Sequence, residues 1–357
     1  MLLTAMAFLI VFCVALAVSM LLVPLSMWVA RRLDAVDRPG GRRTGHDVTP
    51  RLGGIAIFGG FIVAAMIAQW LPVPRYDPYE IIRFVGLIAG AAFIFAGGLL
   101  DDLFDLHPVA QYITHMAAAA IAVGFLIFIQ SVNNPLTGSQ LSWVNAHWFT
   151  VAVSIVWLVL MINTVNFLDG LDGLAGGVSL IAGLLLFINS AFRLIPAQTS
   201  VSLLPLALVG ACLGFLLYNF NPAKVFMGSS GSYFLGYALG TLSIIGGAKM
   251  ATILLVMGLP LLDVAWQVVN RLSLGKNPLE GDRGHLHFRL VDMGISVRQI
   301  VLLYYLFCLF FGGVALLTAS RLFKLIALIV MCVIAVSGFA LLKRMELRSQ
   351  TTAEAQG

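Results

Sequence analysis

The chain contains the stretch GLIAGAAFIFAGGLLDDLFD, from Gly86 to Asp105, in which a long apolar run ends in three closely spaced carboxylates. A second acidic group, between Asn163 and Asp172, also follows an apolar run. Only 16 residues of the chain are acidic, and five of them lie in these two short clusters. Carboxylates are costly to keep beside a membrane, so their concentration at the ends of two spans indicates a functional site. The expected ligand is a divalent metal ion that carries phosphate groups.

The composition places the chain among polytopic membrane proteins. Of its 357 residues, 60% are hydrophobic and 10% are charged, and no polar stretch is long enough for a separate soluble domain. The net charge of +5 does not indicate nucleic-acid binding, because the aromatic residues lie in apolar runs and are not interleaved with Lys and Arg. The four cysteines lie inside apolar segments without a CxxC pair, which predicts buried thiols.

Apolar runs of about 20 residues, the length that crosses a bilayer as a helix, recur along the chain. They predict an all-α membrane domain over residues 1–348 and a short polar cytoplasmic tail over 349–357. The first run is too long for the apolar core of a signal peptide and is expected to be a retained span. We expect about eleven transmembrane helices, near residues 5–30, 53–72, 83–100, 109–130, 148–167, 177–195, 201–218, 231–247, 250–270, 299–319 and 323–342.

The basic residues predict the orientation of these spans. With the N-terminus outside and the C-terminus inside, fifteen of the 21 Lys and Arg residues fall on the inner side, as the positive-inside rule requires. Both acidic clusters then lie on the cytoplasmic face, together with the segment 219–232 and the His285-x-His287 pair. Four polar segments from distant parts of the chain thus share one side, which predicts an active site at the inner membrane surface.

The first cluster offers adjacent carboxylates with different directions. On a helix the side chains of Asp101 and Asp102 diverge by about 100°, so one can hold a metal ion while the other faces a substrate or a basic partner. Asp105 lies about one turn further along the same face. Solvation of a helix end, or a cap for the next span, is the alternative interpretation.

The second cluster places amides and carboxylates at steps of three, at Asn163, Asn166, Asp169 and Asp172. Several glycines in the same stretch allow backbone N–H groups to approach a ligand. A loop with ordinary helix caps explains one such residue, but it does not account well for four at this spacing.

The segment from Asn219 to Ser232 closes one span and opens another. Its Gly and Ser residues at a helix start are suited to cradling an anion with free N–H donors, although such helix starts are common. Phe226 is placed to stack on a planar base, and an aromatic residue at the membrane interface is the alternative.

Histidines and arginines add a basic element to the inner face. His285 and His287 follow Asp282 and Arg283, and without a Cys or a third His at ligand spacing they favour phosphate binding over zinc. His46, among several arginines, extends this basic surface toward anionic headgroups and phosphates. His107, His115 and His147 show no partner pattern. Asp263 lies within the ninth expected span, where a functional or paired role is the default.

Together these segments resemble the polyprenyl-phosphate N-acetylhexosamine-1-phosphate transferase superfamily, which includes WecA, TagO and MraY. The resemblance extends from Arg42 to Met293 and is specific because several motifs occur jointly. They are Pro50-Arg51-Leu52-Gly53-Gly54, Asp101-Asp102-Leu-Phe-Asp105-Leu106, Asn163-x-x-Asn166-x-x-Asp169-Gly-Leu-Asp172-Gly-Leu-Ala, Asn219 through Gly231, and Asp282-Arg-Gly-His285-Leu-His287.

The resemblance implies an integral membrane enzyme of the EC 2.7.8 type in the bacterial cytoplasmic (inner) membrane, dependent on Mg²⁺ (with Mn²⁺ as a substitute). It would transfer N-acetylhexosamine 1-phosphate, GlcNAc 1-phosphate in the first place, from the UDP-sugar to undecaprenyl phosphate. The products would be undecaprenyl-diphospho-sugar and UMP, in the first membrane step of a cell-surface polysaccharide such as a cell-wall polymer or lipopolysaccharide O-antigen. The form of the histidine motif is similar to the WecA and TagO branch. The oligomeric state stays open between a monomer and a homodimer.

The resemblance also implies roles for individual residues. Asp101 would be the base that deprotonates the lipid phosphate, or the nucleophile of a two-step scheme, and Asp102 would support the metal ion and the phosphates. The nucleotide pocket would comprise Asn166, Asp169, Asp172, Asn219 and Phe226, with Phe226 stacking on uracil. Contacts to phosphate or sugar would come from His46, Arg51, Asp282, Arg283, His285 and His287. Phosphoryl transfer between two anions depends on charge neutralisation and in-line positioning, which agrees with this set.

The chain departs from the family pattern at Ser229. The family usually has Met-Gly-Asp-x-Gly-Ser where this chain has Met227-Gly228-Ser229-Ser230-Gly231-Ser232. That Asp is a principal Mg²⁺ ligand in the family, and a neutral hydroxyl is a poor replacement for it. A catalytically impaired protein that only binds nucleotide or lipid is therefore an alternative expectation. Phe288, where WecA-like members often carry another His, is a lesser departure.

Two other classes of membrane protein fit the sequence less well. An ion-coupled transporter would place its ionisable residues near mid-membrane and usually show inverted repeats, whereas here only Asp263 is clearly within a span. An intramembrane aspartyl protease would need two aspartates that face each other inside the bilayer, whereas Asp101 and Asp102 are neighbours at its surface.

Overall fold

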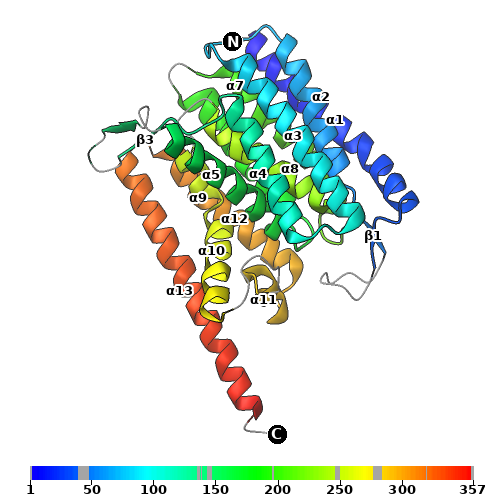
Figure 1. Ribbon diagram of the computed structural model, residues 1–357, viewed down its shortest axis with the longest axis vertical. Coiled ribbons are helices and arrows are strands. Elements are labelled where there is room, and N and C mark those ends of the chain that lie inside the picture. The colour runs from blue at the N-terminus through cyan, green and yellow to red at the C-terminus, as the bar shows by residue number, and fades with distance from the viewer. Residues whose placement is uncertain are drawn as a thin grey trace.

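The computed structural model describes residues 2–38, 48–134, 137, 139–142, 147–194, 197–245, 250–275, 284–318 and 320–354. In this part the chain is almost entirely helical (Figure 1). The α-helices are α1 (Leu2–Arg32), α2 (Gly54–Trp70), α3 (Glu80–Phe104), α4 (Pro108–Gly124), α5 (His147–Leu168), α6 (Leu174–Ile188), α7 (Thr199–Asn219), α8 (Gly228–Ile244), α9 (Met250–Val256), α10 (Gly258–Ser273), α11 (Leu286–Asp292), α12 (Val297–Leu317) and α13 (Arg321–Glu354). A short π-helix, η1 (Asn189–Arg193), extends α6.

Two small antiparallel sheets, which the sequence did not predict, complete the fold. Strand β1 (Val36–Asp37) pairs with β2 (Thr49–Pro50) next to the start of α2. Strand β3 (Ser131–Asn133) pairs with β4 (Gln140–Ser142) at the opposite end of the bundle, between α4 and α5. Both are too short to contribute to the core.

Each of the eleven expected spans coincides with a helix or with a pair of consecutive helices, so the prediction of an all-α polytopic membrane protein is confirmed. In the described residues, seven helices are long and apolar enough to cross a membrane, or eight if the bent pair α9–α10 forms one span. Helices α2, α4 and α8 have 17 residues each. They rise only about 25 Å, which is less than the bilayer core of about 30 Å.

The ninth expected span is broken. Helices α9 and α10 are bent by 72° at Met257. Pro260, in the first turn of α10, has no N–H to donate to the carbonyl of Val256, and its ring would clash with that carbonyl in a straight helix. The break directs α10 and the buried Asp263 toward the end of the bundle that carries the acidic clusters.

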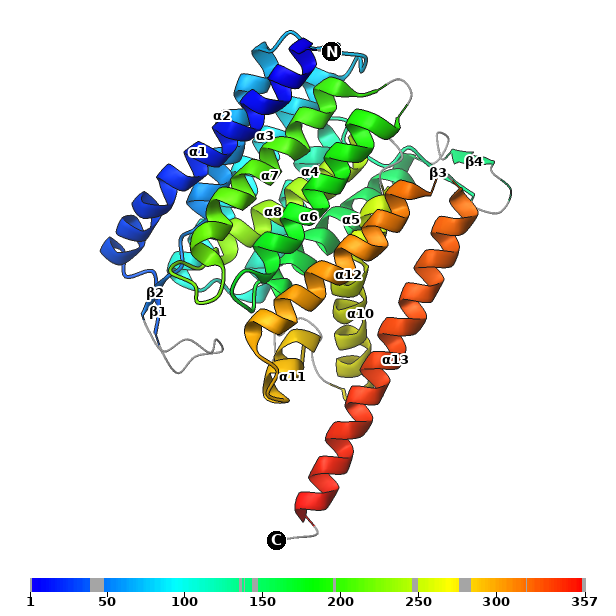
Figure 2. The ribbon, with the colours of Figure 1, turned by 180° about the vertical axis from the view of Figure 1, so that it is seen from behind.

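The centre of the bundle is formed by α7 and α8, which are buried over nearly their whole length. Helices α1, α2, α3, α5 and α6 pack around them, whereas α13 lies along one side and extends beyond the bundle (Figures 1 and 2). The N- and C-termini lie at opposite ends of the molecule. Large apolar side chains on α1, α12 and α13 remain exposed, as expected of surfaces that face lipid.

Small residues allow the helices around α8 to approach its backbone. A Cβ on Gly98 of α3 would lie 2.6 Å from the Cα of Ser230, and one on Gly54 of α2 would lie 2.3 Å from the nitrogen of Gly231. Close backbone packing of this kind is typical of helix contacts in membranes. It presses the first turn of α8 between the start of α2 and the last turns of α3.

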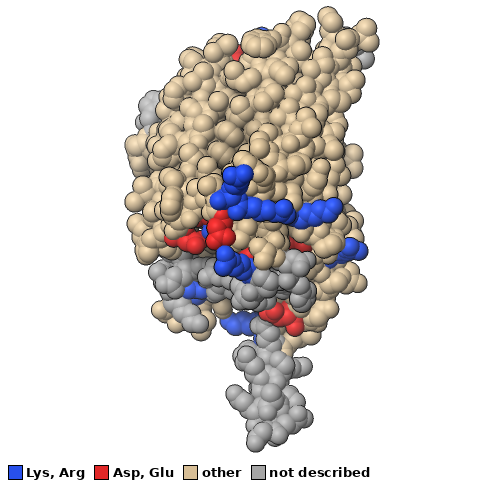
Figure 3. All heavy atoms as spheres, turned by 90° about the vertical axis from the view of Figure 1, so that its right-hand side faces the viewer, with Lys and Arg blue, Asp and Glu red and all other residues tan. Residues whose placement is uncertain are grey.

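The charged side chains are distributed unevenly along the bundle. On the face shown in Figure 3, most of the visible Lys, Arg, Asp and Glu residues form a band across the lower part, whereas the upper part is almost free of them. The ends of α3, α5 and α7 and the starts of α2 and α8 meet at this charged end. The polar segments that the sequence placed on one side therefore share one end of the fold.

We predict that Gly98→Ala lowers the thermal unfolding midpoint in detergent, because the added methyl group would meet the backbone of Ser229 and Ser230, which cannot rotate away. Overpacking of this kind costs about 1–3 kcal/mol. Gly313→Ala is the matched control, since Gly313 is also inside a helix but a Cβ added to it would have no atom within 4 Å. Equal midpoints for the two variants would contradict the close packing of α3 on α8.

Candidate active site

Asp102 is bound to the start of α8. Its Oδ1 accepts the N–H of Ser229 at 2.7 Å, and its Oδ2 accepts the N–H of Ser230 at 3.0 Å. These N–H groups belong to the first turn, where a helix has no internal acceptors and carries a partial positive charge. The side chain is only 3% exposed. The carboxylate therefore joins the last turn of α3 to the N-terminus of α8.

Gly228 makes room for this contact. Its φ of +74° lies in the left-handed region, and a Cβ there would lie 2.6 Å from both carboxylate oxygens of Asp102. The preceding residues pair with the start of α2, since Gly53 donates to the carbonyl of Phe226 at 2.9 Å and Gly54 to that of Met227 at 2.8 Å. The motifs around residues 50–54 and 226–231 thus form one structural unit.

Arg51 lies beside the first acidic cluster. Its Nη2 donates to the backbone carbonyl of Asp102 and to Oδ1 of Asp105 at 3.1 Å. Asp105 is largely exposed, so this ion pair contributes little to stability. The Nε of Arg51 is buried and has no partner in the part of the chain that the structure describes. An anion at this position would find a guanidinium with a donor still to be satisfied.

Asp101 is held by a different set of donors. Its Oδ1 accepts the N–H of Leu106 at 3.0 Å and Nε2 of Gln111 at 2.9 Å, and its Oδ2 accepts the hydroxyl of Tyr233 at 3.1 Å. Gln111 lies on α4 and Tyr233 on α8, and the sequence interpretation missed both. Each occurs inside an apolar segment without a motif, so only their tertiary placement reveals them.

The second acidic cluster separates into two environments. The Nδ2 of Asn163 donates to the carbonyl of Val159 at 2.8 Å and lies 3.3 Å from Nδ1 of His115, inside the bundle. Asn166 is nearer the charged end, where its Oδ1 accepts the hydroxyl of Ser232 at 3.1 Å. The regular spacing in the sequence therefore does not produce a single row of ligands.

Asp172 and Asn219 hold two loops together. The Oδ2 of Asp172 accepts Nδ2 of Asn221 and the N–H of Ala223, both at 3.0 Å. The Oδ1 of Asn219 accepts the N–H of Gly173 at 3.0 Å, and its Nδ2 donates to the carbonyl of Val225 at 2.8 Å. These bonds match the loop-and-cap alternative, whereas contact with a nucleotide stays a prediction for both residues.

Other parts of the expected nucleotide pocket lie close by. Asp169 follows the last residue of α5, with its N–H bonded to the carbonyl of Val165 at 3.1 Å. Phe226 is 7% exposed, in the loop that pairs with residues 50–54. Its stacking on a planar base stays a prediction.

The histidine motif is anchored by Asp263. The Oδ2 of Asp263 lies 2.9 Å from Nδ1 of His285, and its Oδ1 accepts the N–H of Leu286 at 3.0 Å. Phe167, at the end of α5, stacks on the His285 ring with a centroid distance of 5.1 Å. The expected paired role of Asp263 is thus confirmed. The break before α10 brings it to the motif.

His287 lies against the second acidic cluster. A Cβ on Gly170 would be 2.4 Å from its Nε2. The ring is 1% exposed, and neither ring nitrogen has a hydrogen-bond partner among the described residues. Burial and the neighbouring His285 lower the pKa of His287 to about 3, so the ring is neutral at pH 7. Buried imidazole nitrogens are rarely unpaired, which is consistent with a role in ligand binding. His46, Asp282 and Arg283 lie outside the described residues.

The residues at Asp101 and Asp102 fit a magnesium ion only with help from a substrate. Among the described residues there is no group of three His, Cys, Asp or Glu side chains placed to hold a metal ion. Mg²⁺ at phosphoryl-transfer sites is usually held by one or two carboxylates together with substrate phosphates. Two adjacent carboxylates meet that requirement when a diphosphate is present.

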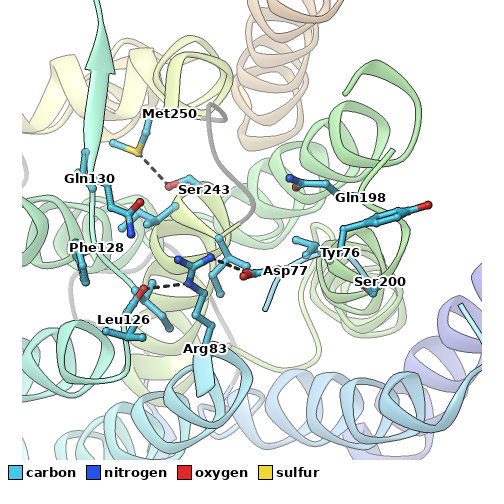
Figure 4. A pocket seen from close by; sticks show the side chains of 15 residues that line it. Tyr76, Asp77, Arg83, Leu126, Phe128, Gln130, Gln198, Ser200, Ser243 and Met250 are labelled. Atoms are coloured by element: carbon cyan, nitrogen blue, oxygen red, sulfur yellow. Dashed lines mark hydrogen bonds and ion pairs between the residues drawn. The ribbon is translucent and has the colours of Figure 1, made fainter. Parts of the chain in front are cut away.

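A separate cavity of about 400 Å³ lies at the other end of the bundle (Figure 4). Arg83 projects into it and is paired with Asp77 at 2.6 Å. Arg83 precedes Asp102 by 19 residues on α3, which corresponds to about 28 Å along the helix. None of the predicted site residues lines this cavity. The chemistry predicted from the sequence belongs to the charged end instead.

Comparison with known proteins shows the family to which the chain belongs. The family model for glycosyl transferase family 4 matches residues 84–247. The chain is 31% identical over 316 residues to a probable undecaprenyl-phosphate N-acetylglucosaminyl 1-phosphate transferase of Bacillus subtilis (strain 168), covering 87% of this chain and 84% of the relative.

Two further relatives extend the comparison. A decaprenyl-phosphate N-acetylglucosaminephosphotransferase of Mycobacterium tuberculosis (strain ATCC 25618 / H37Rv) is 33% identical over 321 residues, covering 83% of this chain and 78% of the relative. A phospho-N-acetylmuramoyl-pentapeptide-transferase of Caldicellulosiruptor bescii is 30% identical over 328 residues, covering 88% and 96%. With these similarities over most of its length, the chain belongs to glycosyl transferase family 4, whose polyprenyl-phosphate sugar-phosphate transferases it resembles throughout.

Proposed function

We propose that the protein transfers N-acetylhexosamine 1-phosphate, in the first place GlcNAc 1-phosphate, from a UDP-sugar to undecaprenyl phosphate. The observation that carries this proposal is the pair Asp101 and Asp102, held rigidly at the start of α8. It occurs in a chain that aligns along most of its length with polyprenyl-phosphate N-acetylglucosaminyl 1-phosphate transferases. The product would begin a cell-surface polysaccharide.

The reaction needs a group that accepts the proton of the lipid phosphate, and it needs the phosphate oxygen to be aligned with the β-phosphorus of the UDP-sugar. Asp101 accepts the proton of the lipid phosphate, and the freed phosphate oxygen attacks the β-phosphorus of the UDP-sugar. A new P–O bond forms there, the bond from the β-phosphorus to the bridging oxygen breaks, and its electron pair leaves with UMP. Both reactants are anions, so the site has to neutralise charge and align them.

Several groups of this chain would supply that neutralisation. The start of α8 carries a partial positive charge and donates two backbone N–H groups to Asp102, beside Asp101. Arg51 and the histidine motif lie at the same end of the bundle. Asp102, with the help of substrate phosphates, would hold a Mg²⁺ ion, which would screen the negative charge of the reactants.

We also propose how the protein lies in the membrane and from which side each substrate reaches the site. The charged end faces the cytoplasm of a bacterial inner membrane, where UDP-sugars are available, and the lipid acceptor enters from the bilayer. The positive-inside distribution of Lys and Arg supports this arrangement.

A second candidate is a protein that binds nucleotide or lipid but turns over slowly. The observation that favours it is Ser229, whose backbone N–H binds Asp102 and which stands at the position where the family resemblance places a metal-binding carboxylate. The two candidates share the same site and differ in rate.

We predict that the purified protein releases UMP from UDP-GlcNAc in the presence of undecaprenyl phosphate and Mg²⁺, and that Asp101→Asn lowers kcat by about 100-fold, as expected for loss of a general base. A coupled assay for UMP measures both. A panel with UDP-GalNAc and UDP-MurNAc-pentapeptide tests the sugar. No UMP from any of these donors would contradict the proposed reaction.

We predict that Ser229→Asp raises Mg²⁺-dependent UMP release by about tenfold or more, because a carboxylate binds this hard cation far better than a hydroxyl does. Ser229→Asn is the control, since it has nearly the same shape without the charge. The gain should disappear with EDTA. Equal rates for the natural chain and Ser229→Asp would sink the idea that a metal ligand is missing here.

We predict that Asp263→Asn lowers kcat by about ten- to hundredfold, the size expected for losing a buried charged hydrogen bond worth about 1.5–3 kcal/mol. The amide can still accept from Leu286 but no longer provides a charged partner for His285. Steady-state kinetics checks this, and unchanged kcat with a normal unfolding midpoint would rule out a functional role for the pair.

A further inference from the structure

Tyr233 reaches Asp101 from inside the bundle. It lies one turn after Ser229 on α8, is 1% exposed, and donates its hydroxyl to Oδ2 of Asp101 at 3.1 Å. The resemblance assigned no role to this residue. Helix α8 therefore binds both aspartates. The Tyr233 hydroxyl binds Asp101, and backbone N–H groups of the same helix bind Asp102.

The Tyr233 ring is itself held by His115 of α4. The two rings meet edge to face, with a centroid distance of 4.4 Å and an interplanar angle of 82°. Such pairs contribute about 0.5–1.5 kcal/mol beyond the area they bury. His115 is 1% exposed, so the contact lies in the closed interior where neither ring has room to turn.

Asn163 determines the orientation of His115. The Nδ2 of Asn163 is 3.3 Å from Nδ1 of His115 and also donates to the carbonyl of Val159. Because an amide nitrogen only donates, Nδ1 has to be the acceptor and the ring proton has to lie on Nε2. Nε2 is buried and has no partner within the described residues. The imidazole is thus held by one bond to Asn163 and by ring contacts with Tyr112 and Tyr233.

Together with Leu106 and Gln111, Tyr233 leaves the Asp101 carboxylate one free acceptor position among the described residues. Within the described residues, Oδ1 accepts two donors, from Leu106 and Gln111, whereas Oδ2 accepts Tyr233 alone. A carboxylate has about four acceptor positions. The remaining one is on Oδ2, and the Tyr233 hydroxyl determines where it points.

We propose that Tyr233, braced by His115 and Asn163, is a positioning residue that aims the free lone pair of Asp101 at the acceptor phosphate. The inference rests on the proposed function, in which Asp101 takes the proton of the lipid phosphate. His115 of α4, Asn163 of α5 and Tyr233 of α8 then share one role. Their contacts in the packed core fix the position of Oδ2 of Asp101.

The kinetic test compares two tyrosines of the same helix. Tyr233→Phe removes the hydroxyl that binds Asp101, and Tyr237→Phe removes one that donates to the carbonyl of Gly86 at 3.0 Å. Both rings are buried in α8. We expect Tyr233→Phe to lower kcat at least about tenfold with the KM for the UDP-sugar within about twofold, and Tyr237→Phe to leave both nearly unchanged. Equal effects of the two variants would overturn the proposal.

A double-mutant cycle tests the brace. His115→Ala should lower kcat in the natural background, because the Tyr233 ring loses its support, and should add little once the Tyr233 hydroxyl is gone. Independent, multiplicative losses would mean that His115 acts by general packing and would overturn its part in the proposal.

Infrared spectroscopy tests the contact between Tyr233 and Asp101 without requiring the protein to be active. Infrared difference spectra in detergent identify the carboxylate stretch of Asp101 by its loss in Asp101→Asn. That band should shift in Tyr233→Phe and stay in place in Tyr237→Phe. If the protein releases no UMP but the band shifts, the proposed reaction fails while the contact stands. If the band does not move, the positioning role fails whatever the activity.

Discussion

The site depends on one buried interaction, between the carboxylate of Asp102 and the N-terminus of α8. A carboxylate that is 3% exposed is stable only if its charge is met by donors, and here the N–H groups of Ser229 and Ser230 meet it. The same contact satisfies helix donors that would otherwise be unpaired in the core. Because Gly98 lets α3 lie directly on this turn, Asp102 is positioned by backbone donors, whereas Asp101 is also held by the side chains of Gln111 and Tyr233.

Asp263 and the histidine motif lie at the charged end because α9 and α10 are separated by a bend. Pro260 prevents α9 and α10 from forming one straight span, and the bend carries Asp263 to the histidine motif. His285 then stacks on Phe167, so the motif is joined to the end of α5. Irregular backbone in a membrane protein is tolerated where it is enclosed by other helices or lines a site. The bend therefore serves to place Asp263 beside His285.

Much of this arrangement was predictable from the sequence, because bilayer-length apolar runs and concentrated charges are strong local signals. They located the helices, the acidic clusters and the histidine motif. The direction of each side chain was not predictable. Asp172 and Asn219 bind loops and Asn163 turns inward to His115, although regular spacing suggested a shared row of ligands. Tyr233 and Gln111 carry no sequence signal at all, since only tertiary packing brings them to Asp101.

The most direct measurement of the central interaction is the thermal unfolding midpoint of Asp102→Asn in detergent, compared with Asp105→Asn. The amide keeps the shape of Asp102 but can accept only one of the two N–H groups and presents its own N–H₂ group to the other. Asp105 is largely exposed and serves as the control. Because Asp102 binds the start of α8, we predict a clear fall in the unfolding midpoint for Asp102→Asn and almost none for Asp105→Asn. Equal midpoints for both variants would contradict the claim that Asp102 holds α3 to the start of α8.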